Sequence, residues 1–314
     1  MAEHFHFSGQ IPPEYAAWRL DQALAELLPE HSRARLQAWI KSGHLTLNGQ
    51  TCRPKDKVRF GDQIDLDITL TPQVVHDAQA IELDIVYEDE DILVLNKAAG
   101  LVVHPAAGHA SGTLLNALLH QCPQLDTVPR AGIVHRLDKD TSGLMVVAKH
   151  VRAQTHLVEQ LQARTMKREY YALVYGSLIS GGTVDAPIGR HPQQRKKMAV
   201  VAQGKPARTH YRVLERFAAH TWVKCQLESG RTHQIRVHMA HVHHPLIGDP
   251  LYLGRLKLPA GASCALKEHL RTFPRQALHA FQLGLIHPRT GEMCSWQAPM
   301  PEDMQLLLAA LRQG

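Results

Sequence analysis

The residues of this chain with the most obvious chemistry gather in one short segment, GIVHRLDKDTSGL, at positions 132–144. Asp138 and Asp140 lie two residues apart in this segment, and Arg136 and Lys139 stand beside them. A carboxylate among basic side chains can belong to a metal loop, cap a solvated turn, or act as a catalytic nucleophile or base. These three chemistries need different neighbours, so the rest of the chain helps to choose among them.

A metal site is poorly supported by the residues around the two aspartates. Asp138, Asp140 and Ser142 match ligand positions of an EF-hand loop, but Lys149 occupies the position where that loop needs a bidentate glutamate. The histidine-rich run HMAHVHH at 238–244 lacks an HExxH pattern, and no cysteine or carboxylate stands at a supporting spacing nearby. We expect several of these histidines on the surface and no metal in the protein.

A single catalytic carboxylate is the remaining active role for Asp138, because such a group can attack or deprotonate a sugar carbon. It must stay ionised while largely buried, which requires a fixed cation nearby. The segment GRTHQIRVHM at 230–239 offers Arg231 and Arg236, and apolar residues at helical spacing beside Arg236 would let that side chain point inward. Spacing alone favours a plainer alternative, in which Asp138 is a turn residue that caps its own backbone.

The charge distribution favours a polyanionic partner. The chain carries a formal net charge of +6 at pH 7. Residues 31–60 hold seven lysines and arginines against one acid, Asp56, and residues 190–212 hold seven and no acid. Two separate basic clusters are typical of a surface that binds nucleic acid, although two solvated faces would show the same composition.

The composition predicts a cytoplasmic protein. No apolar run approaches the roughly 18 residues of a membrane span, and the start, MAEHFHFSGQIPPEY, lacks the basic-then-apolar layout of a signal peptide. The five cysteines are scattered and form no CxxC pattern, which fits reduced thiols. The length of 314 residues suggests about two domains, and we expect the protein to be a monomer.

Residues 1–72 are predicted to form a small N-terminal unit. The segment WRLDQALAELL predicts a helix with its leucines on one face. A second helix should begin after Ser32, a favourable N-cap, and end at Gly43. The segment HLTLNGQ then predicts a short strand and a hairpin turn at Asn48-Gly49, and the alternation in KVRFGDQIDLDI, at 57–68, predicts a half-exposed strand.

A larger unit is expected over residues 83–314, after a linker at 73–82. Helices are predicted over 112–122, 151–164 and 302–313, and strand-like runs over 169–176, 196–202, 209–217, 221–229 and 276–287. The segment DIVYEDEDILVLN adds two strands joined by an acidic turn. Because strands cluster and do not alternate strictly with helices, we expect an α+β fold with a mixed, largely antiparallel sheet.

The N-terminal unit carries residues in the order of a known RNA-binding module. They are Arg19, Leu20, Asp21, Ser32, Arg33, Gly43, Asn48, Gly49, Lys55, Gly61 and Asp62. This pattern resembles the S4 domain, a helix pair followed by small strands. The resemblance implies RNA contact through the exposed basic side chains of the second helix, Arg33, Arg35 and Lys41. The alternative is a basic helical hairpin that only packs on the larger unit.

The larger unit carries five sequence blocks in a familiar order. HRLDKDTSGL, at 135–144, resembles the signature of the RluA family of pseudouridine synthases, which act on large-subunit ribosomal RNA. ILVLNKAAGLVVHP, REYYALVYG, GRTHQIRVHM and HPLIGDPLYLG resemble four supporting blocks. Ala98 stands where proline is common, and Leu253 where glycine is usual, and these departures affect the shape of loops. The resemblance covers the chain from about Ile81 to its C-terminus.

This resemblance implies an isomerase that breaks the N1–C1′ bond of a uridine, turns the uracil and rejoins it through C5, without a cofactor or metal. Asp138 would be the nucleophile or base, and Arg236 would pair with it. Tyr170 would pack against the target base and assist proton removal from C5. Arg136 would fill the place of the flipped uridine, and Arg231 would contact RNA or the loop. The implied partner is large-subunit ribosomal RNA or its precursor particle, in support of ribosome assembly.

Two other functions fit parts of the sequence. A non-catalytic RNA-binding or ribosome-assembly factor could use the N-terminal unit, but it would have no need for the set Asp138, Tyr170 and Arg236. A nucleoside or sugar hydrolase would use a pair of carboxylates. Asp140 is the only second acid near Asp138 in the segment, and we expect it to point elsewhere.

Overall fold

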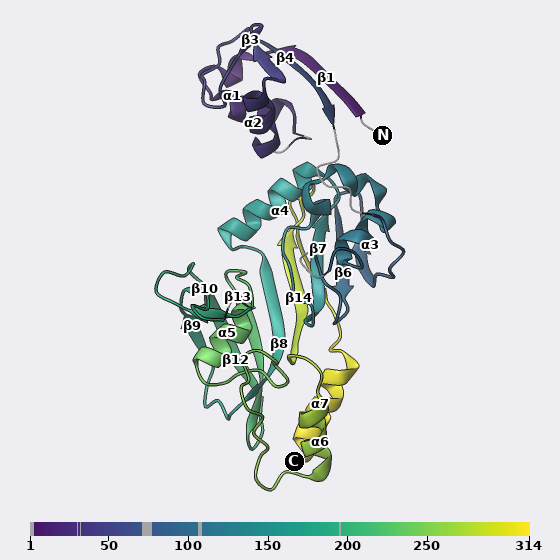
Figure 1. The fold of residues 1–314 in the computed structure, drawn as a ribbon, viewed down its shortest axis with the longest axis vertical. Helices are drawn as coiled ribbons and strands as arrows, with labels where there is room; N and C mark the ends of the chain where they lie inside the picture. The colour runs from purple at the N-terminus through teal and green to yellow at the C-terminus, as the bar shows by residue number, and fades with distance from the viewer. Residues whose placement is uncertain (1–2, 30, 32, 71–76, 106–108, 195) are drawn as a thin grey trace.

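Two β-sheets, each with its own apolar core, organise the chain (Figure 1). The computed structural model describes residues 3–29, 31, 33–70, 77–105, 109–194 and 196–314. The smaller sheet ends at Leu70, and the first strand of the larger sheet begins at Ile85. The predicted linker at 73–82 falls between these strands, and its residues 73–76 lie outside the described ranges.

The N-terminal unit is a four-stranded antiparallel sheet with two helices sharing its core. The strands β1 (Glu3–Gln10), β2 (Leu45–Leu47), β3 (Gln50–Thr51) and β4 (Gln63–Leu70) lie in the spatial order β1-β4-β2-β3. The helical elements are η1 (Pro13–Tyr15), α1 (Leu20–Leu27) and α2 (Arg33–Ser42). Leu24, Leu36 and Leu66 are fully buried between the helices and the sheet.

The predicted helix pair and hairpin turn are confirmed. Asn48 and Gly49 both have positive φ, 51° and 73°, as the tight turn between two antiparallel strands requires. The second helix ends at Ser42, and Gly43 follows it with φ 80°. Ser32, the predicted N-cap, lies outside the described residues.

The strands of this unit differ from the prediction in two places. The strand predicted over 57–68 begins only at Gln63, because Gly61 turns the chain with φ 82°. Strand β1 was not predicted, although it pairs with β4 along its whole length. Its signal is the alternation of histidine with Phe5 and Phe7, a period of two in a segment without Val or Ile.

The larger unit is built on a nine-stranded sheet, and the predicted mixed, largely antiparallel α+β fold is confirmed. Its main order is β5-β6-β7-β14-β8-β13-β12-β9, with β15 paired to β14, and only β7 and β14 run parallel. The strands are β5 (Ile85–Glu88), β6 (Ile92–Lys97), β7 (Ser142–Ala148), β8 (Lys167–Tyr175), β9 (Gly182–Asp185), β12 (Arg208–Arg216), β13 (His220–Leu227), β14 (Leu278–Ile286) and β15 (Met293–Gln297). A separate hairpin contains β10 (Ile188–Arg190) and β11 (Met198–Val200).

Helices cover both faces of the central strands. They are η2 (Pro123–Thr127), η3 (Pro129–Gly132), α3 (Leu114–Gln121), α4 (Val151–Ala163), α5 (Gln234–His241), α6 (Cys264–Thr272) and α7 (Glu302–Gln313). Along β6, Leu93 and Leu95 share a core with α3, whereas Ile92 and Val94 share another with α4. Strands buried on both faces read as continuous apolar runs, which explains the sequence of β6 and β7.

Candidate active site

The five candidate residues of the larger unit line one pocket. Asp138, Tyr170 and Arg236 border a cavity of about 880 Å³ together with Arg136 and Arg231. They come from the loop before β7, from β8, from the segment that leads into α5, and, for Arg236, from α5 itself. The other three candidates, the basic side chains of α2, belong to the N-terminal unit and do not line this pocket.

Asp138 is held by a buried arginine that a second carboxylate fixes in place. Arg236 Nη1 donates to Asp138 Oδ2 at 2.9 Å. The same guanidinium donates from Nε and Nη2 to Asp249 at 2.8 and 2.9 Å. Only 4% of the Arg236 side chain and none of the Asp249 side chain is exposed, against 17% for Asp138. Arg236 is therefore a rigid cation that presents one free edge to Asp138.

The electrostatics of this trio keep Arg236 charged. Burial alone lowers the pKa of Arg236, but the hydrogen bonds and charge of Asp249, reinforced by Asp138, raise it above its ordinary value. Asp249 was missed in the sequence, where it stands in the last block, HPLIGDPLYLG, without an assigned role. Its own carboxylate also accepts the backbone N–H groups of Leu251 and Tyr252. Its position is thus set by the loop that carries it.

The backbone around Asp138 is held in place by hydrogen bonds from the buried side chain of Lys97. Its Nζ donates to the carbonyls of Ala98, Leu101 and Lys139 at 2.7, 2.9 and 2.9 Å. Burial lowers the pKa of Lys97 to about 7, while the nearby charges of two aspartates in the loop oppose this shift. Three carbonyl acceptors match the three N–H donors of an ammonium, so Lys97 ties the loop after β6 to the loop that carries Asp138.

Two further contacts fix the end of this loop against β14. Arg275 Nη1 donates to the Asp140 carbonyl at 3.1 Å, and Gln276 Nε2 donates to Thr141 Oγ1 at 3.0 Å. Gly143 has φ 118°, and a Cβ at this position would lie 2.2 Å from the Ala280 carbonyl oxygen. Glycine is therefore needed where β7 meets β14. The Asp140 side chain is not part of the pocket lining.

Tyr170 gives the floor of the pocket an aromatic surface. Tyr170 is 5% exposed and lies on β8 between Cys225 of β13 and Ala280 of β14. Burial raises the pKa of its hydroxyl, Asp138 adds to the rise, and Arg168 opposes it, so the phenol stays protonated. Burial also lowers the pKa of His135 to about 3. The flat, uncharged ring of Tyr170 suits the face of a nucleobase.

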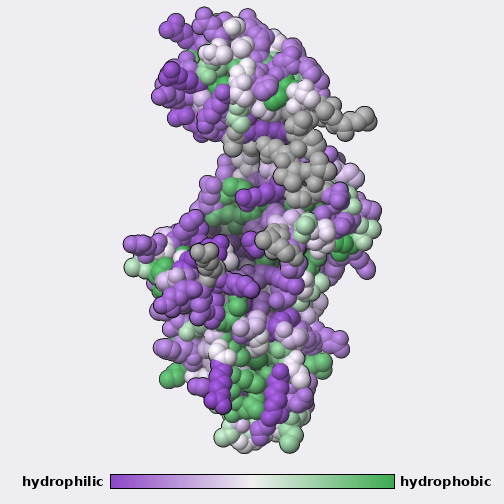
Figure 2. Space-filling view, in the orientation of Figure 1, coloured by the Kyte–Doolittle hydropathy of each residue, from purple (hydrophilic) through white to green (hydrophobic). Residues whose placement is uncertain are grey.

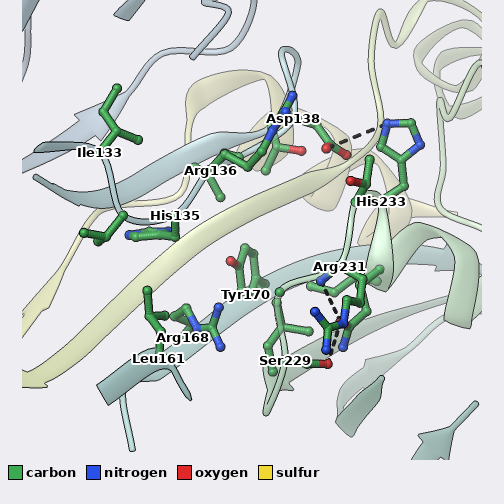
Figure 3. A pocket seen from close by; sticks show the side chains of 18 of the residues that line it. Ile133, His135, Arg136, Asp138, Leu161, Arg168, Tyr170, Ser229, Arg231 and His233 are labelled. Atoms are coloured by element: carbon green, nitrogen blue, oxygen red, sulfur yellow. Dashed lines mark hydrogen bonds and ion pairs between the residues drawn. The ribbon is translucent and has the colours of Figure 1, made fainter. Parts of the chain in front are cut away.

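His233 is a pocket residue that the sequence reading did not single out. It adopts φ 56° at the N-terminus of α5 and places Nε2 3.8 Å from Asp138 Oδ1. Figure 3 marks the contact between these two side chains with a dashed line. Its Nδ1 shares a hydrogen bond of 2.8 Å with the Tyr252 hydroxyl. Burial lowers the pKa of His233, and the Asp138 charge opposes this shift. The left-handed backbone of a non-glycine residue directs this ring toward the carboxylate.

Of the four histidines in the run 238–244, His241 and His243 are exposed, as expected of several of them, whereas His238 is not. That side chain is fully buried and shares hydrogen bonds with Thr209 Oγ1 and the Ala186 carbonyl. It fills the core under α5, where its polar atoms are satisfied by protein groups. Helical spacing places it one turn before Val242 on a partly apolar face, a signal that the histidine-rich composition obscured.

One group of residues in the described part of the chain has the geometry of a metal site, and it lies away from the pocket. It contains Asp89, Asp91 and His287, from the acidic turn and the end of β14. Asp89 Oδ1 accepts the backbone N–H of Ile92, and its Oδ2 contacts His287 Nε2 at 2.8 Å. The polar atoms of this cluster already form hydrogen bonds with protein groups, so the cluster stabilises the acidic turn.

Comparisons with known proteins agree with this geometry. Residues 91–241 match the family described as RNA pseudouridylate synthase, and residues 18–64 match the S4 domain. Proteins named ribosomal large subunit pseudouridine synthase D are similar along their length. The one from Pseudomonas aeruginosa is 59% identical over 100% of this chain and 98% of its own. Those from Xanthomonas campestris and Escherichia coli K12 are 57% and 53% identical, over 96% and 99% of this chain and 92% and 96% of theirs.

Solved structures support the same assignment. Human RNA Pseudouridylate Synthase Domain Containing 4 is 26% identical with a TM-score of 0.57, over 73% of this chain and 92% of its own. Human RNA Pseudouridylate Synthase Domain Containing 1 is 26% identical with a TM-score of 0.53, over 76% and 98%. With relatives this similar over full length, the chain belongs to the RNA pseudouridylate synthase family and is an isomerase.

Proposed function

We propose that this protein isomerises uridines of large-subunit ribosomal RNA to pseudouridine, with Asp138 as the nucleophile or base. The observation that carries the proposal is a carboxylate held 2.9 Å from a buried guanidinium at the edge of an open pocket. The names of the full-length relatives supply the class of RNA. A purely RNA-binding factor would not need a carboxylate supported in this way, and Asp140 does not join the pocket as a hydrolase would require.

The two oxygens of Asp138 have different surroundings. Oδ2 accepts the hydrogen bond from Arg236, whereas Oδ1 lies 3.8 Å from His233, too far for a hydrogen bond. Oδ1 is therefore the oxygen that reaches the ribose, either by adding to C1′ or by taking the proton from C2′. The N1–C1′ bond breaks and the uracil turns. C5 then bonds to C1′ while Oδ1 leaves C1′ on the first route, or while C2′ takes its proton back from Asp138 on the second. N1 gains a proton, and the C5 proton leaves. Tyr170 would hold the ring face and assist that last step.

The target base must leave its stack to reach this pocket, which costs a few kcal/mol. Arg136 is exposed and stands two residues before Asp138 at the pocket wall. We assign it the place that the flipped uridine vacates, because a guanidinium can stack on bases and hold phosphates at the same time. Arg231 donates from Nε to the Pro206 carbonyl at 3.1 Å. It would support the loop of the second basic cluster and contact RNA from there.

The N-terminal unit would add affinity through α2. Figure 2 shows that hydrophilic residues cover most of the visible face of this unit. Lys41 is exposed, while the Arg35 guanidinium lies 5.2 Å from the centre of the Trp39 ring. Arg33 Nη2 lies 2.7 Å from the buried Asp21 carboxylate, so part of its charge is neutralised within the unit. We therefore assign the exposed Lys41 a larger share of the RNA attraction than Arg33.

We also propose that the protein works as a cytoplasmic monomer in ribosome assembly, without a cofactor. Cysteines at five positions are unpaired, which fits a reducing compartment. In the described part of the chain, a helix capable of spanning a membrane is not found. Residues 1–72 would act as the RNA-binding domain and residues 83–314 as the catalytic domain, joined by the linker at 73–82.

A pseudouridine map of total RNA, made with and without the gene for this protein, tests the proposed function. We expect signals to vanish at one or more uridines of the large-subunit ribosomal RNA and to return when the parent gene is restored. A gene with Asp138→Asn serves as the matched control and should not restore them. Loss of pseudouridine only in transfer RNA, or no loss at all, would overturn the assignment of the substrate.

Replacing two of the three basic side chains of α2 should weaken RNA binding without slowing the chemical step. In the full chain, the double variant Arg35→Ala/Lys41→Ala is expected to lower the salt slope of binding by roughly one to two units, because fewer counterions are released. Filter binding at several salt concentrations measures the slope. Arg312→Ala is the control, since Arg312 lies on α7 and pairs with Glu215. An unchanged slope in the double variant would give α2 a packing role only.

A further inference from the structure

Arg168 is a buried arginine of the pocket that has no acidic partner among the described residues. It lies on β8, two residues before Tyr170 and on the same face of the strand, and it is 6% exposed. Its Nε has no hydrogen-bond partner, and its Nη2 makes only a long contact of 3.5 Å with the Glu228 carbonyl. A buried guanidinium in this state costs free energy unless something else binds it.

The guanidinium of Arg168 is held in place by packing. A Cβ on Gly230 would lie 2.8 Å from Nη1, so the side chain lies directly against the backbone of the loop after β13. Figure 3 shows Arg168 beside His135 and Leu161, with Tyr170 on the side toward Asp138 in this view. His135 stays neutral at physiological pH, because burial and the Arg168 charge lower its pKa to about 3. The pocket therefore keeps a fixed, uncompensated positive charge on the floor beyond Tyr170.

We propose that Arg168 donates a hydrogen bond to a carbonyl oxygen of the flipped uracil and stabilises the negative charge that this ring carries while it is detached. When the N1–C1′ bond breaks, its electron pair stays on the uracil and is shared with the C2 and C4 oxygens. Formation of the C5–C1′ bond uses that pair, the C5 proton leaves, and N1 gains a proton. Arg168 is then a catalytic residue, and this inference rests on the proposed function.

The depth of Arg168 favours the base over a phosphate of the RNA backbone. Arg136 is exposed and Arg231 is half-buried, so these two side chains stand where the strand passes. Asp138, which must reach the ribose, is 17% exposed in its side chain. Tyr170 and Arg168, at 5% and 6%, lie deeper. A nucleotide that places its ribose at Asp138 and its ring against Tyr170 brings a ring carbonyl, and not a phosphate, to the floor.

The test compares two RNA substrates with the parent and with Arg168→Met. Under single turnover with a uridine target, Arg168→Met should lose on the order of 10²-fold in rate, the typical cost of removing one donor to a developing charge. With 5-fluorouridine at the target, fluorine withdraws electrons and makes the ring a better leaving group. The loss of rate caused by Arg168→Met should then be clearly smaller. The rate with this RNA is measured as the disappearance of the 5-fluorouridine nucleoside from digested RNA. Arg168→Lys, which keeps the charge but not the fork of donors, should fall between.

The controls separate this role from others. Lys167→Met, an exposed neighbour on β8, should behave as the parent with both RNAs. Equal losses of rate with both RNAs would overturn the proposed role. A larger dissociation constant with a lower salt slope and an unchanged rate would also overturn it, and would favour a contact with phosphate. If Arg168→Met melts early, Arg168→Lys carries the same comparison. The comparison uses RNA on which the parent is active. If Arg168→Met then behaves as the parent, the role of Arg168 is refuted and the proposed function stands. If the parent itself is inactive on uridine in ribosomal RNA, the proposed function is refuted.

Discussion

Asp138→Asn is expected to abolish pseudouridine formation and to leave the fold intact. The substitution removes the charge and the nucleophilic oxygen with almost no change in volume, and losses of at least ~10⁴-fold are typical when such a group is removed. Stability should hardly change, because Arg236 keeps its two hydrogen bonds to Asp249. The buried charge of Arg236 therefore still has a partner, whereas most substitutions in a buried ion pair leave one charge unpaired.

Tritium release from C5-labelled uridine in RNA measures this loss, with thermal melts and filter binding beside it. Asp140→Asn is the matched control, since it removes the neighbouring carboxylate, which does not line the pocket. It should stay within about tenfold of the parent. Near-normal tritium release by a folded Asp138→Asn protein would refute the mechanism. Equal losses in both variants would show that Asp140 takes part in the reaction as well, against the single-carboxylate mechanism.

Arg236→Leu is expected to cost both activity and stability. Two carboxylates, Asp138 and the fully buried Asp249, lose their shared cation, and breaking a buried pair typically costs roughly 3–5 kcal/mol in the free energy of unfolding. A carboxylate without its cation is harder to ionise. The remaining activity should therefore rise more steeply with pH than that of the parent. Denaturant melts and rate-versus-pH curves measure the two effects.

Arg231→Leu separates this effect from a general loss of positive charge at the pocket. Arg231 donates to the Pro206 carbonyl and makes no ion pair with a described residue. Its replacement should weaken RNA binding, and the melting temperature and the shape of the pH curve should stay close to those of the parent. If Arg236→Leu has the melting temperature and pH curve of the parent while Arg231→Leu does not, Arg236 is not the partner of Asp138 and our assignment is wrong.

The pair Asp138 and Arg236 could be anticipated because both signals are local. Asp138 stands in a block that resembles a family signature, and Arg236 stands beside apolar residues at helical spacing, so an inward direction followed from the period of the helix. The same reasoning did not reach Asp249. Its backbone forms a loop without a period, and a loop acid reads as a turn residue unless its partner is known.

Strand β1 shows a different limit. Its alternation of phenylalanine and histidine was present in the sequence, but histidine is neither a strong strand former nor a breaker, and the partner strand β4 lies more than fifty residues away. Pairing energy in a sheet comes from cross-strand neighbours. The secondary structure of a terminal segment with a weak local preference is therefore determined by the strand with which it pairs.

The sequence by itself determined the family and the order of most elements, and it predicted the catalytic carboxylate, because these rest on local patterns of side-chain type. The tertiary structure decided which groups meet. The sheet places β7, β14 and β8 side by side, and this order brings Asp138 to Arg236 across 98 residues. It also brings Lys97 to the backbone of the loop and leaves Arg168 without an acidic partner among the described residues. Periodicity reports which way a side chain points, whereas its partner depends on strand order and register, which long-range packing alone selects.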